Sequence, residues 1–171
     1  MKATGVVRRI DELGRIVIPK EIRKVLKIRN GDSLEIYTDN SNNIILSKHS
    51  KLEEIKKICE SYSNALYRNY QINIILIDYE KIIATNKEIT KNLDSFKLNK
   101  QLERLIIESK ETYINDLELN EKIKFRNAYL RPINFYGDNL GLIILASNND
   151  ISQQDKKHVE VLELLLTNLF E

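Results

Sequence analysis

The chain has 171 residues, with 27 Lys and Arg against 25 Asp and Glu, 42% hydrophobic residues and 30% charged residues. This length accommodates one ordinary domain or two small ones. The apolar runs are far shorter than the roughly 18 residues that a membrane-spanning helix needs, and the first residues lack the apolar core of a signal peptide. We therefore expect a cytoplasmic protein that does not enter a membrane. A single cysteine, Cys59, excludes an internal disulfide, and with only His49 and His158 we predict no metal and no cofactor.

The first thirty residues combine an apolar pattern with a turn and a short helix. Residues 6–18 contain two β-rich stretches that meet at a turn ending in Gly14, which predicts a hairpin. Pro19 ends the second stretch, and the sequence PKEIRKVLKI then predicts a short helix that ends at Gly31. The side chains expected to face inward from this helix are Ile22, Val25 and Leu26.

A second hairpin is predicted directly after this helix. Residues 33–38 alternate between apolar and polar side chains, and an apolar stretch at residues 44–46 follows a turn rich in Asn, Ser and Asp. A unit of about 48 residues is close to the size below which one chain rarely buries enough apolar surface to be stable alone. We therefore expect this unit to dimerise.

The positive charge of the chain is concentrated at its N-terminus. Residues 1–30 carry nine basic and three acidic side chains, whereas residues 51–171 carry 17 basic and 19 acidic ones. A scattered set of arginines is often only a solvated strand face. Here the basic residues alternate with apolar core positions, and a two-fold dimer would double them onto one surface. This favours a polyanion such as DNA as the partner.

Three stretches of the N-terminal unit resemble one known family. KATGVVRRIDELGRIVIPKEIRKVLKI, followed by GDSLEIY and IILSK, is similar to the N-terminal domain of the AbrB family of bacterial transition-state regulators. The resemblance implies that residues 1–50 form an all-β swapped-hairpin domain with a short helix, in which two chains interlock into one dimeric barrel. It also implies a DNA-binding transcriptional regulator of the sporulation or transition-state type.

The resemblance also assigns the DNA-binding residues. The arginines with which the family contacts DNA fall on Arg8, Arg15 and Arg23. The fourth contact falls on Lys24, which departs from the family because lysine lacks the planar fork that reads a guanine edge bidentately. The basic side chains that we expect to contact phosphates are Lys2, Arg9 and Lys20.

Residues 51–171 predict a separate α+β domain after a short polar linker. The apolar pattern has a helical period from residue 52 and then changes to strands, a helix, further strands and a closing helix that Ser152 and Asp155 begin. This order is similar to the GAF fold. The expected elements are helices over 52–66, 98–108 and 152–170, strands over 72–77, 82–85, 113–114, 128–136 and 140–146, and a hairpin turn at 136–139.

The closing helix has more apolar side chains than one buried face requires. One face would carry Val159, Leu162, Leu165, Leu166 and Leu169, and a second would carry Val161, Leu164 and Phe170. We expect the second face to meet another chain, so that two DNA-binding dimers join into a homotetramer. The alternative role for this GAF-like domain is to sense a small-molecule ligand, which the sequence does not identify.

Two other classes of protein are weighed against a regulator. An enzyme could use Cys59 and His158 as nucleophile and base, or an acidic loop formed by Asp116, Glu118 and Glu121. Cys59 lies on an apolar stripe, where a buried and inert thiol is usual, and we predict no catalysis. An antitoxin could share the swapped-hairpin domain, but it would bind its toxin through a disordered tail rather than a folded extension.

Overall fold

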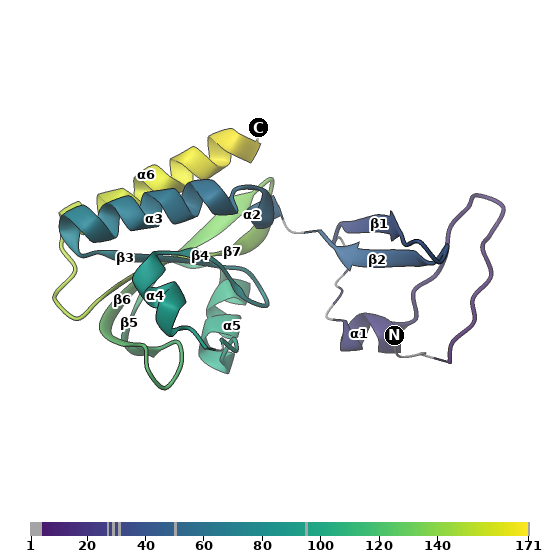
Figure 1. Cartoon of the computed structure of the whole chain (residues 1–171), viewed down its shortest axis with the longest axis horizontal. Coiled ribbons are helices and arrows are strands. Elements are labelled where there is room, and N and C mark those ends of the chain that lie inside the picture. The colour runs from purple at the N-terminus through teal and green to yellow at the C-terminus, as the bar shows by residue number, and fades with distance from the viewer. Residues whose placement is uncertain are drawn as a thin grey trace. The chain divides into compact units, whose positions relative to one another are not determined.

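The computed structural model describes residues 5–26, 28, 30, 32–49, 51–94 and 96–170. The chain forms two compact units, residues 1–49 and residues 50–171 (Figure 1). The elements of the first unit are α1 (Lys20–Val25), β1 (Leu34–Thr38) and β2 (Ile44–Lys48). Those of the second are α2 (Lys51–Glu54), α3 (Lys56–Tyr70), β3 (Asn73–Ile77), β4 (Ile82–Thr85), α4 (Lys87–Asn92), α5 (Lys100–Glu108), β5 (Thr112–Glu118), β6 (Lys124–Phe135), β7 (Asp138–Ser147) and α6 (Gln153–Phe170).

The predicted second hairpin and the short helix are both present in the N-terminal unit. Strands β1 and β2 pair antiparallel, with Ile36 opposite Leu46. Helix α1 begins directly after Pro19, whose φ of −58° already suits a helix. Its expected inward face is only partly realised, because Val25 is 80% exposed and Leu26 is also exposed. Among the described residues of one chain, no apolar layer packs against this face of the six-residue helix. The expected end at Gly31 lies outside the described residues.

The first predicted hairpin is not formed within the single chain. Residues 6–10 and 15–19 have no strand assignment, and the backbone hydrogen bonds of this segment lie at its turn. Its apolar side chains are largely uncovered, with Val7 86% and Val17 73% exposed. Among the described residues the N-terminal unit therefore has one two-stranded sheet and no closed barrel. Strand pairing needs a partner, and this segment finds none within the described residues of its own chain.

The C-terminal unit is built on one five-stranded sheet. Its strand order is β4-β3-β7-β6-β5, and the neighbouring strands pair antiparallel. The hairpin turn between β6 and β7 is at the predicted place, with Tyr136 and Gly137 at positive φ values of 48° and 87°. Such a pair of left-handed residues forms the tight turn whose twist matches antiparallel strands.

Helices cover both faces of this sheet, as Figure 1 shows. Along β3, Ile74 and Leu76 pack against α3 and α6, whereas Ile75 and Ile77 pack on the opposite face with α4 and α5. Because side chains alternate along a strand, burial on both faces requires a continuous apolar run. Residues 74–77 of β3, with the sequence IILI, are such a run.

The closing helix begins as predicted and one helix was missed. The N–H of Ser152 donates to the Asp155 carboxylate at 2.8 Å, and the N–H of Asp155 donates to the Ser152 hydroxyl at 3.2 Å. This reciprocal pair is a capping box. Helix α4 was not predicted because its six residues are too few to show a helical period; the signal was Asn86, whose side chain accepts a hydrogen bond from the N–H of Ile89. No helix in the described part of the chain has the length and apolar character to cross a membrane.

Candidate nucleic-acid interface

The turn at residues 11–15 is the best-defined feature of the basic segment. The Asp11 carboxylate accepts hydrogen bonds from the backbone N–H groups of Leu13 at 3.0 Å and Arg15 at 2.8 Å. The N–H of Gly14 donates to the Asp11 carbonyl at 2.9 Å, and Gly14 has a φ of 75°, which a residue without a Cβ adopts easily. A carboxylate that satisfies its own turn in this way is a common turn-forming device. The turn is therefore held by the side chain of its first residue.

Arg15 is oriented by the same carboxylate. Its Nε donates to Asp11 Oδ2 at 2.8 Å, and its side chain is 70% exposed. A guanidinium has five N–H donors, and Nε supplies only one of them. The two terminal nitrogens, Nη1 and Nη2, have no hydrogen-bond partner within the described part of the chain. They form the edge that binds phosphate or a guanine base in protein–DNA complexes.

The carboxylate of Asp11 stays ionised at neutral pH. Hydrogen bonds from the backbone N–H of Arg15 and then from its guanidinium hold the pKa of Asp11 below its ordinary value. A carboxyl group whose pKa is lowered in the folded state loses this stabilisation only as the pH falls through that lowered pKa. The contact with Arg15 is therefore present throughout the neutral range.

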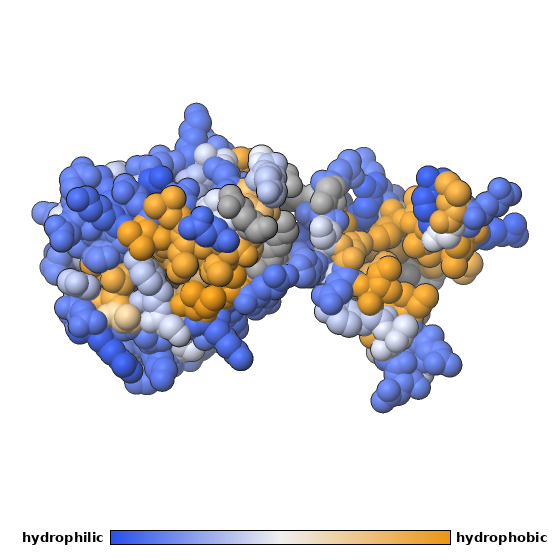
Figure 2. Space-filling model, turned by 90° about the horizontal axis from the view of Figure 1, so that it is seen from above, coloured by the Kyte–Doolittle hydropathy of each residue, from blue (hydrophilic) through white to orange (hydrophobic). Residues whose placement is uncertain are grey.

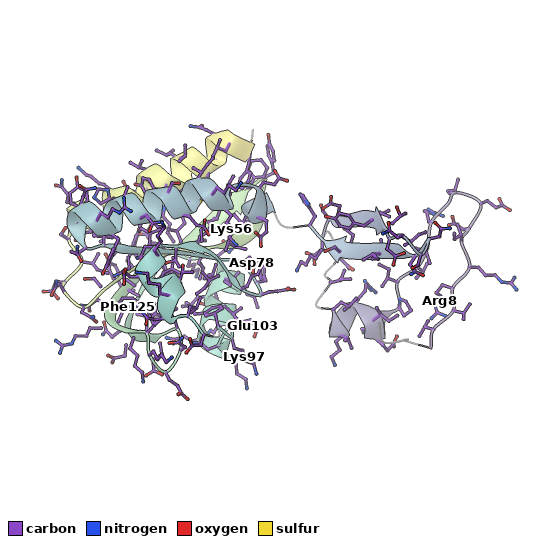
Figure 3. All side chains as sticks on the ribbon, in the orientation of Figure 1. Arg8, Lys56, Asp78, Lys97, Glu103 and Phe125 are labelled. Atoms are coloured by element: carbon purple, nitrogen blue, oxygen red, sulfur yellow. The ribbon has the colours of Figure 1, made fainter. Side chains whose placement is uncertain are left out.

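Four of the other predicted DNA-binding residues are exposed. Arg8 (Figure 3) and Arg9 precede the turn in sequence, and Lys20 and Lys24 lie on α1. Arg8 Nη1 donates only to the carbonyl of the preceding residue, at 3.2 Å. The structure does not join these side chains to one another, so a shared surface would have to form when chains or DNA bring them together. Lys2 lies outside the described residues.

Arg23 differs from the other predicted residues because it is half-buried. Its Nη1 donates to the side-chain oxygen of Asn30 at 2.7 Å, and its Nε is buried without a partner in the described part of the chain. The carbonyl of Arg23 also accepts a hydrogen bond from the N–H of Ile28. Arg23 therefore connects α1 to the segment that follows it, which sequence reasoning did not predict. Asp11 was missed as well, although an acid placed four residues before an arginine around a glycine turn was a usable signal.

A second surface lies on the C-terminal unit, where the outer side of α3 and α6 carries apolar side chains. Leu164 is 64% exposed. Figure 2 views this side of the unit and shows an apolar area within a hydrophilic surround. The exposed large aliphatic side chains of these two helices are Ile58, Val161, Leu164 and Leu169, which we call the helix patch.

At the end of the closing helix, the side chains that are buried and exposed differ from the prediction. Leu169 was expected to be buried and is exposed, whereas Phe170 was expected on the second face and packs against the core. The ring of Phe170 lies edge-on to that of Phe135, with 5.3 Å between centroids. Val161 and Leu164 lie on the outer face as predicted, and Val159, Leu162 and Leu166 are buried.

The two residues considered as nucleophile and base, Cys59 and His158, take part in the packing and hydrogen bonding of the C-terminal unit. Cys59 lies on the buried side of α3 and is almost fully buried in the core, and this burial raises the pKa of its thiol to about 11. The carbonyl of His158 accepts a hydrogen bond from the Tyr62 hydroxyl, and its ring lies 5.1 Å from that of Tyr70. The nucleophile needs the thiolate form, which a pKa near 11 suppresses at neutral pH.

Two of the three acids that were expected in a loop, Asp116 and Glu118, lie on strand β5 instead. Asp116 has a φ of 56° within β5, and the residues on either side of it pair with β6 in one unbroken register. Glu118 forms an ion pair with Lys124 at 2.6 Å, and Glu121 is exposed. These carboxylates therefore do not form one cluster.

Cys59 should react very slowly with thiol reagents in the folded protein. At pH 7.5 a thiol with a pKa near 11 is almost entirely protonated, and its sulfur is shielded from solvent. We expect labelling by 5,5′-dithiobis(2-nitrobenzoate) to be at least about 100-fold slower than in the chain unfolded with guanidinium. Equal rates in the two states would show that the thiol is accessible and would reopen the catalytic interpretation.

Comparisons with known proteins divide the chain as its fold does. Residues 7–54 match the family described as antidote-toxin recognition MazE, bacterial antitoxin. Residues 54–167 match the family described as stage V sporulation protein T C-terminal, transcription factor. The second match covers most of the C-terminal unit.

Relatives among characterised proteins come from Bacillus subtilis (strain 168). Stage V sporulation protein T is 34% identical over 166 residues, which covers 94% of this chain and 93% of that protein. The transition state regulatory protein AbrB is 57% identical over 49 residues, which covers 29% of this chain and 50% of that protein. The putative transition state regulator Abh is 53% identical over 49 residues, which covers 29% of this chain and 52% of that protein.

A solved structure shares the fold at low sequence identity. The type II free methionine-R-sulfoxide reductase from Thermoplasma acidophilum superposes with a TM-score of 0.50, covers 70% of this chain and is 13% identical. At that identity the likeness concerns the fold alone. The relatives that cover the sequence are regulators. The chain belongs to the AbrB family of transcription regulators, among the members that carry a stage V sporulation protein T C-terminal domain.

Proposed function

We propose that this regulator binds double-stranded DNA through a dimer of its N-terminal domain, residues 1–50, and that residues 51–171 join two such dimers into a tetramer. The observation that carries the proposal is the exposed turn that presents Arg15 within a segment of net charge +6. Its relatives are a sporulation protein and transition-state regulators, and we assign this chain to the same type of control. It would act in the cytoplasm, where bacterial DNA lies.

The exposed apolar side chains of the N-terminal unit support a dimer. Val7, Val17 and Val25 would remain largely in water if the chain were alone. Soluble monomers rarely leave this much apolar surface uncovered in so small a unit. A second copy can cover these side chains and also supply strands for the unpaired segments at residues 6–10 and 15–19. A swapped-hairpin dimer would do both.

The basic side chains of such a dimer would bind DNA mainly by charge. Phosphate contacts by Lys and Arg supply most of the affinity in protein–DNA binding, and base contacts supply the selection. We assign phosphate contacts to Lys2, Arg9, Lys20 and Lys24. We assign recognition contacts to Arg8 and Arg15, whose planar groups can pair bidentately. Arg23 contributes from a half-buried position and keeps α1 in place.

The identity of residue 24 should affect affinity more than sequence preference. Lys24→Arg keeps the charge and adds a planar fork, so a residue that contacts only phosphate should change affinity by no more than about threefold. We would measure affinity with a selected duplex and repeat the selection from random duplexes. A shifted consensus would show that position 24 reads a base, for which discrimination of about 1–3 kcal/mol is usual.

For the C-terminal unit we propose oligomerisation through the helix patch. A helix packed against one sheet buries a single stripe, and no described residue of the chain covers Val161 and Leu164 on the outer side of α6. The edges of the patch are charged and polar, as expected of a surface that buries an apolar centre against a partner. A two-fold contact here, together with the N-terminal dimer, closes into a tetramer.

Ligand sensing has less support than oligomerisation. The proposed GAF-like fold rests on the five-stranded sheet with helices on both faces. The face covered by α4 and α5 is packed with aliphatic and aromatic side chains. The buried polar side chains Asp78, Thr85 and Asn86 are satisfied by hydrogen bonds within the unit. They therefore do not point to a ligand.

The antitoxin alternative is not favoured. Its support is the family name matched by residues 7–54. An antitoxin of that type would use a disordered tail, whereas residues 51–94 and 96–170 form a sheet with two apolar cores. Limited proteolysis of the intact chain should leave a stable C-terminal fragment.

The function is tested by capture of DNA with the purified full chain. Sheared genomic fragments from a relative's host, Bacillus subtilis, would be incubated with the protein at two salt concentrations, and the bound pool would be sequenced. We expect strong retention at about 50 mM salt and weaker, more selective retention at about 200 mM. Absence of retention at both concentrations would contradict the proposal.

A further inference from the structure

The turn at residues 11–15 is built a second time in the same unit. Asp39 lies 28 residues after Asp11, and its carboxylate accepts hydrogen bonds from the N–H groups of Ser41 at 2.9 Å and Asn43 at 3.0 Å. The N–H of Asn42 donates to the Asp39 carbonyl, and Asn42 has a φ of 59° in the place of the first turn's glycine. The two turns therefore share one hydrogen-bond pattern.

The turns differ in the side chain that closes them. In the second turn, Asn43 Nδ2 donates to Asp39 Oδ2 at 2.9 Å; in the first, Arg15 Nε makes the matching bond at 2.8 Å. A short amide is thus enough to complete this turn. The long guanidinium at position 15 is not required for the local fold, and its additional donors must be explained in another way.

The carboxylate of Asp11 also requires an explanation, because an anion on a DNA-binding surface repels phosphate. Its two backbone hydrogen bonds fix its position, and its second oxygen then holds one edge of the Arg15 guanidinium. The other edge, formed by Nη1 and Nη2, is directed away from the bond to Asp11. An arginine ordered before binding loses less conformational freedom when it docks.

We infer that Asp11 is a positioning residue: it orients the guanidinium of Arg15 so that its free edge meets a base edge in DNA. The inference rests on the proposed function and adds to it the residue that sets selectivity. The role has two consequences of opposite sign. Removing the negative charge should leave affinity for unselected DNA equal or higher, while discrimination between sequences falls.

The test uses Asp11→Asn in the full chain, with Asp39→Asn as the matched control. An asparagine oxygen can still accept the backbone hydrogen bonds of the turn, but a neutral amide holds a guanidinium weakly. Each variant is selected against the same pool of random 20-base-pair duplexes. Affinities are then measured for the duplex that the unaltered protein selects and for a scrambled duplex of equal composition.

We expect Asp11→Asn to lower the ratio of these two affinities roughly tenfold, as for the loss of one bidentate base contact. Affinity for the scrambled duplex should stay equal or rise. Asp39→Asn should leave the ratio unchanged. Circular dichroism and thermal melting of both variants establish that the fold persists.

The remaining outcomes separate the inference from the proposed function. If both variants lose affinity for both duplexes together and melt earlier, the turns are only structural and the inference is overturned. If Asp11→Asn keeps the ratio while Arg15→Ala lowers it, Arg15 reads DNA without help and the inference alone fails. If the unaltered protein binds duplex DNA without preference, selectivity by Arg15 is excluded although DNA binding stands. Failure to bind duplex DNA at all would overturn both.

Discussion

Arg15→Glu should weaken the binding of duplex DNA by about 100-fold or more while the chain keeps its fold. In a dimer the substitution removes two cations from the basic surface and adds two anions to it. The side chain is 70% exposed, and the corresponding turn closes with Asn43, so the fold does not depend on the guanidinium. Fluorescence anisotropy with a labelled duplex measures the affinity, and circular dichroism of the same samples reports the fold.

The matched control for this prediction is Lys97→Glu, which makes the same change of charge on the C-terminal unit (Figure 3). Lys97 is exposed, and DNA affinity should change little because it lies outside the proposed DNA-binding domain and exposed charges are screened by salt. Similar losses in the two variants would mean that only net charge matters. If Arg15→Glu unfolds the protein, Arg15 is a structural residue and its recognition role is contradicted.

The double substitution Val161→Lys and Leu164→Lys should split the proposed tetramer into dimers. Both side chains lie in the helix patch, where a lysine would have to be desolvated in the interface. Loss of the second dimer removes the gain from simultaneous binding, so affinity for DNA with two sites should fall by about 100-fold. Sedimentation equilibrium gives the mass, and binding to duplexes with one and two sites separates avidity from intrinsic affinity.

Glu103→Lys provides the control for that double variant, because it makes the same change of net charge at an exposed position of α5, which packs on the opposite face of the sheet (Figure 3). It should leave the mass of the assembly unchanged. A double lysine variant that also keeps its mass would show that the helix patch is not an interface, and the tetramer proposal would then be wrong.

The C-terminal unit was largely predictable because its order comes from contacts within one chain. The alternating burial along β3, with Ile74 inward on one face and Ile75 on the other, requires the apolar run that the sequence shows. The predictions failed where a helix is too short to show a helical period and where a helix ends. Helix α4 is too short to show a period, and the last turn of α6 exchanges the expected places of Leu169 and Phe170, because Phe170 packs on Phe135.

The N-terminal unit was less predictable because the segment before α1 has no pairing strand in the described part of the chain. Residues 6–10 and 15–19 have strand-like sequences but find no strand to pair with, and Val25 has no apolar layer to face. Charge identified the basic residues, since an uneven distribution of charge is visible in a sequence. It did not identify Asp11 or Asn30, because the carboxylate and the amide act through hydrogen bonds that only the folded turn and helix bring about.

The central claim, that a basic dimeric domain binds the DNA backbone, is tested most directly by the salt dependence of affinity. The full chain would be titrated with one duplex at salt concentrations between about 50 and 200 mM. If each dimer contacts about eight phosphates through four basic positions on each chain, the plot of log K against log salt should have a slope near −7, at roughly −0.9 for each phosphate. A slope shallower than about −2 would contradict binding through this surface.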